Sequence, residues 1–327
     1  MTRDIISKLK KQNLLGRGGA GFPAWQKWHM VKKANASKKY IICNGSEGEP
    51  GVFKDGYILE NYPETVVEGL KIALKTIDNS SAYICLRKDY YQKFKVKLEK
   101  LIKGFPIVIF QKTGGYLAGE ETTIINAIEG KKRLEPRIKP PLPSQAGLFG
   151  CPTLINNVET FYYVSKIAEN EYKKTRFYSI SGEVKNKGVY EMPENYPISE
   201  VLKKTNNYPD FDFFAQVGGG ASGEILLKKE LGRSACGAGA IIIFDKKKTN
   251  PVSLMKKWAD FFAKENCDKC APCREGAFRI QEILKSKNID KKLLDDLMFV
   301  LKETSFCALG AAIPVPFESF LKKVYTF

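Results

Sequence analysis

The most specific chemical signal in the sequence is a group of cysteines near its end. Cys267, Cys270 and Cys273 follow one another at intervals of three residues, and Cys307 lies across an intervening helical segment. Three thiols at this spacing wrap one corner of a turn, and a distant fourth thiol completes the set that a [4Fe–4S] cluster requires. A structural zinc ion is the alternative, although zinc sites usually pair two separate C-x-x-C knuckles. The cysteines therefore predict a metal centre, with the cluster favoured over zinc.

A glycine-rich stretch near the start of the chain could bind an anion. Gly16, Gly18 and Gly21 formally satisfy the pattern G-x-G-x-x-G. A dinucleotide fingerprint should follow a strand, whereas the preceding residues are predicted to be helical, so we reject the standard Rossmann interpretation. Glycines still allow backbone N–H groups to crowd around an anion, and Arg17 and Lys27 add positive charge. A flexible linker is the alternative.

Two further loops combine glycines with carboxylates. The segment 43–51 follows a predicted strand, and the segment 114–122 joins glycines, an aromatic ring and adjacent carboxylates before a helix. Open α/β sheets bind ligands at the carboxyl ends of their strands. Carboxylates repel phosphate, so these loops are better suited to bind the hydroxyl and amide groups of a nucleotide. For the segment 43–51, an ordinary acidic turn is the alternative. The rigid loop 139–143 and the polar segment 153–157 complete the candidate set.

The elements around these motifs define the predicted domains. Strands at 39–43, 81–86 and 106–110 alternate with helical segments, which indicates a layered α/β domain. The chain is then β-rich to about residue 245, as in a small β-grasp module, and helical beyond Pro251, as in a small bundle around the cysteines. The predicted domains are 1–171, 172–250 and 251–327.

Composition and charge narrow the functional classes. The net charge of the 327-residue chain is +17, but the basic residues are scattered, so an acidic protein partner is favoured over nucleic acid. No apolar run approaches the roughly 20 residues of a membrane span, and no signal-peptide core is present. The sequence predicts a soluble, cytoplasmic protein. The single histidine, His29, leaves no Ser-His-Asp or Cys-His arrangement and removes most nucleophilic hydrolases.

Taken in order, the motifs resemble one known family. They read GRGGAGFPAWQKW, NGSEGEPGVFKDG, GEETTIINAIEG, PPLPSQAGLFGCPTLINNVET and CDKCAPCREG. They are similar to those of the NADH-binding flavoprotein (F-type) subunit of respiratory complex I and of the related diaphorase subunits of NAD-linked hydrogenases and formate dehydrogenases. The resemblance extends from Gly16 to about Pro316. It implies a non-standard, Rossmann-like α/β domain for FMN, a ubiquitin-like β-grasp domain and a C-terminal four-helix bundle holding one [4Fe–4S] cluster.

The resemblance also implies site residues. The FMN site would comprise Gly16, Arg17, Gly19, Lys27, Asn44, Glu47, Gly119, Glu120, Glu121, Asn156 and Asn157. The NADH site would comprise Phe22, Glu49, Tyr116, Glu121 and Lys139, and the cluster ligands would be Cys267, Cys270, Cys273 and Cys307. Glu49 and Glu121 are expected to act in the reaction by orienting cofactor hydroxyls and amides, not by exchanging protons.

Three departures from the family pattern carry expectations of their own. Ser46 stands where the family usually has Asp, which weakens one flavin contact, and Met30 and Leu142 stand where aromatic residues usually sandwich the adenine. Relatives carry a longer segment before the glycine motif, so we expect a short or truncated form.

The function implied is NADH dehydrogenase activity within a complex. A hydride passes from NADH, the substrate, to FMN, and electrons leave singly through the cluster. The partners implied are a thioredoxin-like [2Fe–2S] subunit and a larger iron–sulfur subunit, which can hold this chain at the inner face of a membrane without insertion. The final acceptor stays open: a quinone, a hydrogenase, a formate dehydrogenase or a bifurcating assembly. Two alternatives are a cluster-bearing subunit that has lost NADH binding and a zinc-stabilised nucleic-acid binder.

Overall fold

The computed structural model describes residues 4–286 and 288–325, which form two compact units. The first contains the residues up to Gly48 together with Phe53–Thr175, and the second contains Glu49–Val52 together with the residues from Arg176 onward. The predicted domains 1–171 and 251–327 extend to residues 1–3, 287 and 326–327, which lie outside the described residues. The division into three domains stays a prediction.

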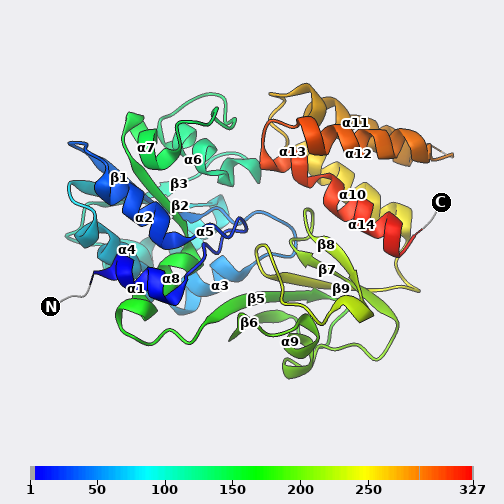
Figure 1. Ribbon diagram of the computed structural model, residues 1–327, viewed down its shortest axis with the longest axis horizontal. Helices are drawn as coiled ribbons and strands as arrows, with labels where there is room; N and C mark the ends of the chain where they lie inside the picture. The colour runs from blue at the N-terminus through cyan, green and yellow to red at the C-terminus, as the bar shows by residue number, and fades with distance from the viewer. Residues whose placement is uncertain (1–3, 287, 326–327) are drawn as a thin grey trace. The chain divides into compact units, whose positions relative to one another are not determined.

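The first unit alternates helices with strands (Figure 1). Its elements are α1 (Ile5–Gln12), α2 (Ala24–Lys33), β1 (Lys39–Gly45), α3 (Lys54–Asn61), α4 (Pro63–Thr76), β2 (Ser80–Leu86), α5 (Lys88–Leu101), β3 (Ile107–Gln111), η1 (Leu117–Gly119), α6 (Glu121–Ile128), α7 (Pro143–Ala146), η2 (Leu148–Gly150), β4 (Thr153–Asn157) and α8 (Val158–Ala168).

The strands of the first unit form one parallel sheet in the order β3-β2-β1-β4. Ile41, Ile42 and Cys43 of β1 are all fully buried, which requires that both faces of the sheet are covered. Ile42 packs in a cluster with Ile124 and Ile125 of α6, and α4 and α8 also contact β1. The layered α/β architecture is therefore confirmed. Strand β4 was not predicted as a strand.

The second unit begins with a mixed sheet and ends in helices (Figure 1). Its elements are β5 (Thr175–Gly182), β6 (Gly188–Pro193), α9 (Ile198–Lys204), β7 (Phe213–Gly218), β8 (Glu224–Leu227), η3 (Lys228–Glu230), β9 (Ala240–Asp245), α10 (Pro251–Glu265), α11 (Ala271–Lys285), α12 (Lys291–Thr304), α13 (Ala308–Ala312) and α14 (Pro314–Lys323). The strand order is β6-β5-β9-β7-β8, with β5 parallel to β9 and β7 antiparallel to both β8 and β9.

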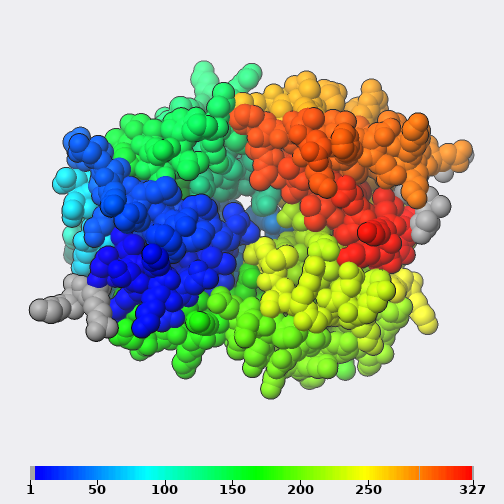
Figure 2. All heavy atoms as spheres, viewed as in Figure 1, coloured from blue at the N-terminus to red at the C-terminus, as the bar shows by residue number. Residues whose placement is uncertain are grey.

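Two apolar centres hold the second unit together. Ile198 and Val201 of α9 are buried against Tyr178 and Ile241 of the sheet. In the helical part, Trp258 lies edge-on against nearby phenylalanine rings of α14. Helices α11 and α12 form part of the molecular surface (orange in Figure 2). Within 4–286 and 288–325, no helix has the length and apolar character needed to cross a membrane.

Candidate functional site

The carboxyl edge of the parallel sheet brings together three predicted segments. The register pairs Asn44 at the end of β1 with Asn157 at the end of β4. The chain passes from β1 to β2 and β3 on one side, whereas β4 lies on the other side of β1. Such a switch in strand order leaves a crevice where open α/β sheets bind ligands. Asn44 Nδ2 donates to Gly119 O at 3.0 Å, which holds the segment 114–122 at the same edge.

The glycine-rich loop adjoins this edge. A Cβ at Gly18 would stand 3.5 Å from Asn157 Cβ, and Gly16 N donates to Phe22 O at 2.8 Å to close the loop. Gly19 has a φ of +110° and leaves open space around the position of an absent Cβ. Only glycine adopts this backbone without strain. The loop therefore presents bare backbone beside the end of β4, as a bound nucleotide requires.

The side chain of Arg17 points into the first unit rather than into the loop. Its guanidinium donates to Tyr172 OH at 3.0 Å and lies 4.0 Å from the Glu159 carboxylate, and the residue is only 5 % exposed. The backbone N–H of Arg17 donates to Thr160 Oγ1 at 3.0 Å. Arg17 thus fixes the loop to α8, and the contribution of its charge to anion binding stays a prediction.

Lys27 contacts two of the residues predicted for NADH. It forms an ion pair with Glu121, and its Nζ lies 5.7 Å from the centre of the Phe22 ring. Next to it on α2, Trp28 Nε1 donates to Asn156 Oδ1 at 2.9 Å. One turn of α2 therefore ties the glycine loop, the start of α6 and the end of β4 to one another.

Glu120 has a structural role besides its predicted contact with FMN. It is the N-cap of α6, where its carboxylate accepts from Thr122 N at 2.8 Å and Thr123 N at 3.0 Å, and Lys139 Nζ donates to it at 2.8 Å. Burial alone would raise the pKa of Glu120, but the hydrogen bonds from Lys139 and Thr122 hold it below its usual value. Glu120 is therefore charged at neutral pH, and it links the predicted NADH residue Lys139 to the first turn of α6.

A buried group of charges lies behind the two asparagines. Lys54 is 1 % exposed, and its Nζ lies 2.6 Å from Asp55 Oδ1, 3.0 Å from Glu159 Oε2 and 3.2 Å from Asn157 Oδ1. Burial alone would lower the pKa of Lys54, but the carboxylates of Asp55, Glu159 and Glu47 raise it well above its usual value. The ammonium group is therefore permanently charged and holds the end of β4 in place.

Glu47 joins this group through the start of α3. Its carboxylate accepts from Asp55 N at 3.1 Å, from Gly56 N at 3.3 Å and from Tyr90 OH at 2.7 Å. Burial, and next the negative charge of Asp55, raises the pKa of Glu47 to about 7, against the opposite effects of Lys54 and Tyr90. These contacts anchor the loop 43–51, and the predicted contact of Glu47 with FMN stays a prediction.

Ser46 offers the crevice a hydroxyl. The residue is 6 % exposed, and its Oγ has no hydrogen-bond partner within the described part of the chain. A Cβ at Gly119 would lie only 3.3 Å from Ser46 Cβ, so the two backbones approach closely here. A buried hydroxyl normally finds a partner. Ser46 at the end of β1 is therefore available to a ligand in the crevice.

The remaining predicted NADH residues are divided between the two units. Tyr116 lies beside Gly48 in the first unit, where a Cβ at Gly48 would be 3.4 Å from Tyr116 Cα. Glu49 belongs to the second unit, and its Oε1 accepts from Ser222 N at 2.8 Å and from Ala221 N at 3.3 Å. The carboxylate of Glu49 thus fixes the loop between β7 and β8.

Met30 and Leu142, which stand at typically aromatic positions, come from neighbouring elements. Ser144 Oγ lies 3.8 Å from Met30 Sδ, and Leu142 immediately precedes α7 and is 42 % exposed. The predicted weakening of adenine stacking at these positions stays a prediction.

The four candidate ligand cysteines all belong to the second unit. Cys267 and Cys270 lie between α10 and α11, Cys273 lies in the first turn of α11, and Cys307 is the N-cap of α13. Burial, and then the negative charges of Cys270, Cys307 and Cys267, raises the pKa of Cys273 to about 12. Gly310, three residues after Cys307, lies close to Cys273, because a Cβ on it would stand 3.2 Å from Cys273 Cβ.

Backbone N–H groups point at the fourth thiol. Burial raises the pKa of Cys307, and the N–H groups of Leu309 and Gly310 oppose this by hydrogen bonding to its sulfur. Such donors stabilise a thiolate, which is the form that binds iron or zinc. In the part of the chain that is described, no three His, Cys, Asp or Glu side chains converge closely enough to hold a single metal ion.

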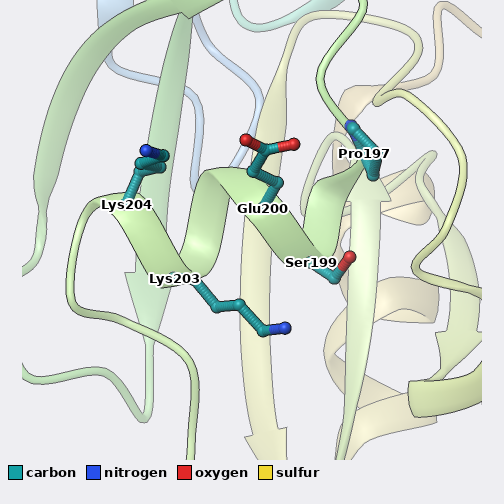
Figure 3. A pocket seen from close by; sticks show the side chains of 5 residues that line it. All are labelled: Pro197, Ser199, Glu200, Lys203 and Lys204. Carbon is teal, nitrogen blue, oxygen red and sulfur yellow. The ribbon is translucent and has the colours of Figure 1, made fainter.

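A shallow hollow of about 480 Å³ on α9 contains none of the predicted site residues. Its lining is Pro197, Ser199, Glu200, Lys203 and Lys204, and the close view shows Lys203 and Lys204 pointing to different sides of the helix (Figure 3). No aromatic ring or convergent polar group faces the hollow, so we assign it no role.

Two family models match the chain. A "Nuo51 FMN-binding domain" matches residues 9–166, and an "NADH-ubiquinone oxidoreductase-F iron-sulfur binding region" matches residues 253–325. The first match contains the sheet edge described above, and the second contains all four clustered cysteines.

Curated relatives and a solved structure align along almost the whole chain. An NADH-quinone oxidoreductase subunit of the F type in Rhizobium meliloti (strain 1021) is 32% identical over 98% of this chain and 86% of that protein. The NADP-reducing hydrogenase subunit HndC of Solidesulfovibrio fructosivorans is 33% identical over 97% of this chain and 73% of that protein. A chain in the crystal structure of an NAD+-reducing [NiFe]-hydrogenase in the H2-reduced state superimposes with a TM-score of 0.89 at 29% identity. The match covers 97% of this chain but only 60% of the hydrogenase chain.

Proposed function

This chain belongs to the family of F-type NADH-quinone oxidoreductase subunits, and from that premise we propose how its residues serve the reaction. The protein is an NADH dehydrogenase subunit with FMN and a [4Fe–4S] cluster. When bound, FMN supplies the chemistry of accepting a hydride and releasing electrons one at a time. The protein supplies binding, orientation and exclusion of water.

The observation that best supports FMN binding is the group of residues at the carboxyl edge of the sheet, where the strand order switches. Asn44 and Asn157 are paired at this edge, bare glycine backbone adjoins Asn157, and Ser46 contributes a buried hydroxyl without a partner among the described residues. These groups fit a flavin nucleotide, which needs close backbone approach for its phosphate and hydrogen bonds for its ribityl chain and ring. The proposed FMN residues are Gly16, Arg17, Gly19, Lys27, Asn44, Glu47, Gly119, Glu120, Glu121, Asn156 and Asn157.

NADH is proposed to bind through five residues implied by the family pattern. Its residues would be Phe22, Glu49, Tyr116, Glu121 and Lys139, with the exposed ring of Phe22 available for stacking. Glu121 is ion-paired with Lys27, so this carboxylate is oriented before any ligand arrives. Glu49 and Glu121 would orient cofactor amides and hydroxyls.

The second unit is proposed to carry the electron exit. Cys267, Cys270, Cys273 and Cys307 would each bind one iron of the cluster. Their fit to an iron–sulfur cluster rests on the chemistry of the donor set, four thiols, and on the closeness of the turn after Cys307 to Cys273, since a Cβ on Gly310 would stand 3.2 Å from Cys273 Cβ. We assign the mixed sheet with α9 as a β-grasp domain, and α10, α11, α12 and α14 as a four-helix bundle around the cluster.

Reconstitution tests the proposed function. The full chain is loaded with FMN, iron and sulfide, and flavin absorption is followed as NADH is added. We expect the flavin band to bleach and iron to be bound in place of zinc. Bound iron without bleaching would instead identify a cluster-bearing subunit that has lost NADH binding, and bound zinc would exclude the cluster.

NADH should be strongly preferred over NADPH, and Glu49→Gln should weaken that preference. We propose that Glu49 lies on the adenosine side of the nucleotide, where a carboxylate repels a 2′-phosphate. Glutamine removes the charge but keeps an oxygen that can accept from Ser222 N. We expect the relative kcat/KM for NADPH to rise about tenfold, or about 1.4 kcal/mol in transition-state free energy. The control is Glu183→Gln, at an exposed carboxylate of the same unit. An unchanged cofactor ratio for Glu49→Gln contradicts the proposal.

The family places this chain in a multi-subunit complex, and we propose a thioredoxin-like [2Fe–2S] subunit and a larger iron–sulfur subunit as its partners. We also propose that these subunits hold it at the inner face of a membrane.

Binding to acidic partners should be sensitive to salt, because the chain has a net charge of +17 and exposed charges are screened beyond about 8 Å at physiological salt. Copurification of the partners should therefore decline as salt rises. A complex that is indifferent to salt would indicate an apolar interface.

A further inference from the structure

The turn that carries the last cysteine contains a buried hydroxyl with no role so far. Ser305 is the C-cap of α12, two residues before Cys307. Its Oγ is buried and has no hydrogen-bond partner in 4–286 or 288–325. A hydroxyl withdrawn from water without a partner costs free energy, so a buried one normally marks a missing ligand or water.

The surroundings of a glycine show that this hydroxyl lies near the cysteines. A Cβ at Gly310 would stand 2.4 Å from Ser305 Oγ and 3.2 Å from Cys273 Cβ. The same Gly310 follows Cys307 by three residues. Ser305 Oγ therefore lies within one small region together with two of the four candidate ligands, one from α11 and one from the turn before α13.

Its neighbour in the sequence behaves differently. Thr304 is exposed, and its Oγ1 donates to Val300 O at 2.7 Å, as hydroxyls near the end of a helix commonly do. Ser305 makes no such bond to its own helix within the described residues, and its Oγ lies beside Gly310 instead. The Thr304 hydroxyl is thus used within its own helix, whereas the Ser305 hydroxyl is available to a bound group.

We propose that the Ser305 hydroxyl donates a hydrogen bond to a sulfur atom of the [4Fe–4S] cluster and thereby raises the reduction potential of the cluster. The proposal rests on the proposed function, because it needs the cluster that the four cysteines are proposed to hold. Ser305 is then a positioning residue that adjusts the acceptor of the electrons and does not itself bind iron.

The direction of the effect follows from charge. Reduction adds one negative charge to the cluster and its thiolates, and a hydrogen-bond donor stabilises the more negative state. Hydrogen bonds to the sulfur atoms are among the features that set the potentials of iron–sulfur clusters. A donor at Ser305 therefore favours transfer of electrons to the cluster.

The test is a redox titration of the cluster in the full, FMN-loaded chain, followed by electron paramagnetic resonance. Ser305→Ala should lower the ratio of reduced to oxidised cluster at a fixed potential about tenfold, which is about 59 mV for a one-electron couple. The pair Ser305→Thr and Ser305→Val differs in the hydroxyl but hardly in size. The threonine variant should titrate near the wild-type potential and the valine variant should titrate lower. Thr304→Ala, which removes the neighbouring exposed hydroxyl, should leave the potential unchanged.

Iron content is measured on every preparation, so that loss of the cluster is not mistaken for a shift in potential. If Ser305→Ala loses iron, the threonine and valine pair decides. Equal potentials for that pair, or for Ser305→Ala and wild type at full iron content, overturn the inference. A wild-type chain that binds no iron and shows no cluster signal contradicts the proposed function itself.

Discussion

Replacing Lys54 by methionine is expected to destabilise the first unit by about 3–5 kcal/mol, because it leaves buried carboxylates without their cation. Lys54 Nζ contacts both Asp55 and Glu159, and neither acidic side chain is more than 4 % exposed. Methionine fills most of the volume of the lysine side chain but offers no charge. The free energy of unfolding is measured by urea denaturation with FMN held at one concentration.

An exposed ion pair provides the matched control for this change. Lys93 Nζ lies 2.8 Å from Glu60 Oε1, with both side chains more than half exposed. Such a pair contributes about 0–1 kcal/mol, so Lys93→Met should be almost neutral. Adding Glu159→Gln to Lys54→Met should recover part of the lost stability. Equal stability of the two lysine variants would contradict the assignment of Lys54 as an obligatory buried cation.

The loss should also depend on pH. In the folded chain, burial raises the pKa of Glu47 to about 7 from 4.5, so its contribution to stability is complete below 4.5 and is lost as pH rises through 7. At pH 8 Glu47 is negatively charged in addition to Asp55 and Glu159. The ammonium group of Lys54 then contributes more to the free energy of unfolding. The difference between wild type and Lys54→Met should therefore be larger at pH 8 than at pH 5.

The features that the sequence predicted well are those determined by local spacing. Short apolar runs predict most strands of the parallel sheet, and helical periodicity predicts the helices that connect them. The cysteine spacing 267, 270 and 273 can be read directly from the sequence, and the structure places the turn after Cys307 close to Cys273. The same spacing predicts that these cysteines bind iron, and we propose that role for them.

Strand β4 shows why other features were missed. Thr153–Asn157 has polar residues at three of its five positions and no apolar alternation, so it was interpreted as a polar segment. Thr153 is nevertheless buried, because its Oγ1 accepts from Leu148 N at 2.8 Å. Asn156 is buried because Trp28 donates to it from 128 residues away. A local pattern contains no information about such a partner.

The acidic loops show the same limit for function. Glu120, which is proposed as an FMN residue, also caps α6, and Glu49 contacts Ser222, which lies 173 residues later in the chain. Arg17, which is proposed to add charge at the anion, also donates to Tyr172 OH. In each case residue type predicted a polar contact correctly, whereas the identity of the partner depends on the packing of distant segments.

Cys270→Ala should leave NADH able to bleach the flavin, while electron transfer to the natural acceptor in the assembled complex falls to background. Every residue proposed for FMN lies in the first unit, whereas Cys270 lies in the second, just before α11. Small dyes that reach the flavin directly should still be reduced. Cys236→Ala, which removes an exposed cysteine of the same unit outside the cluster motif, should leave both activities intact.

A bound cluster also stabilises the fold. Activity alone therefore does not show whether Cys270 serves electron transfer or the stability of the second unit. Iron and FMN are therefore measured on the same preparation of the variant. Loss of iron and of electron transfer to the natural acceptor, with FMN and dye reduction retained, places the cluster after the flavin on the electron path. If iron is lost, FMN is kept and electrons still reach the acceptor at the wild-type rate, the cluster is structural, and Cys267, Cys273 and Cys307 would stabilise the helices without carrying electrons.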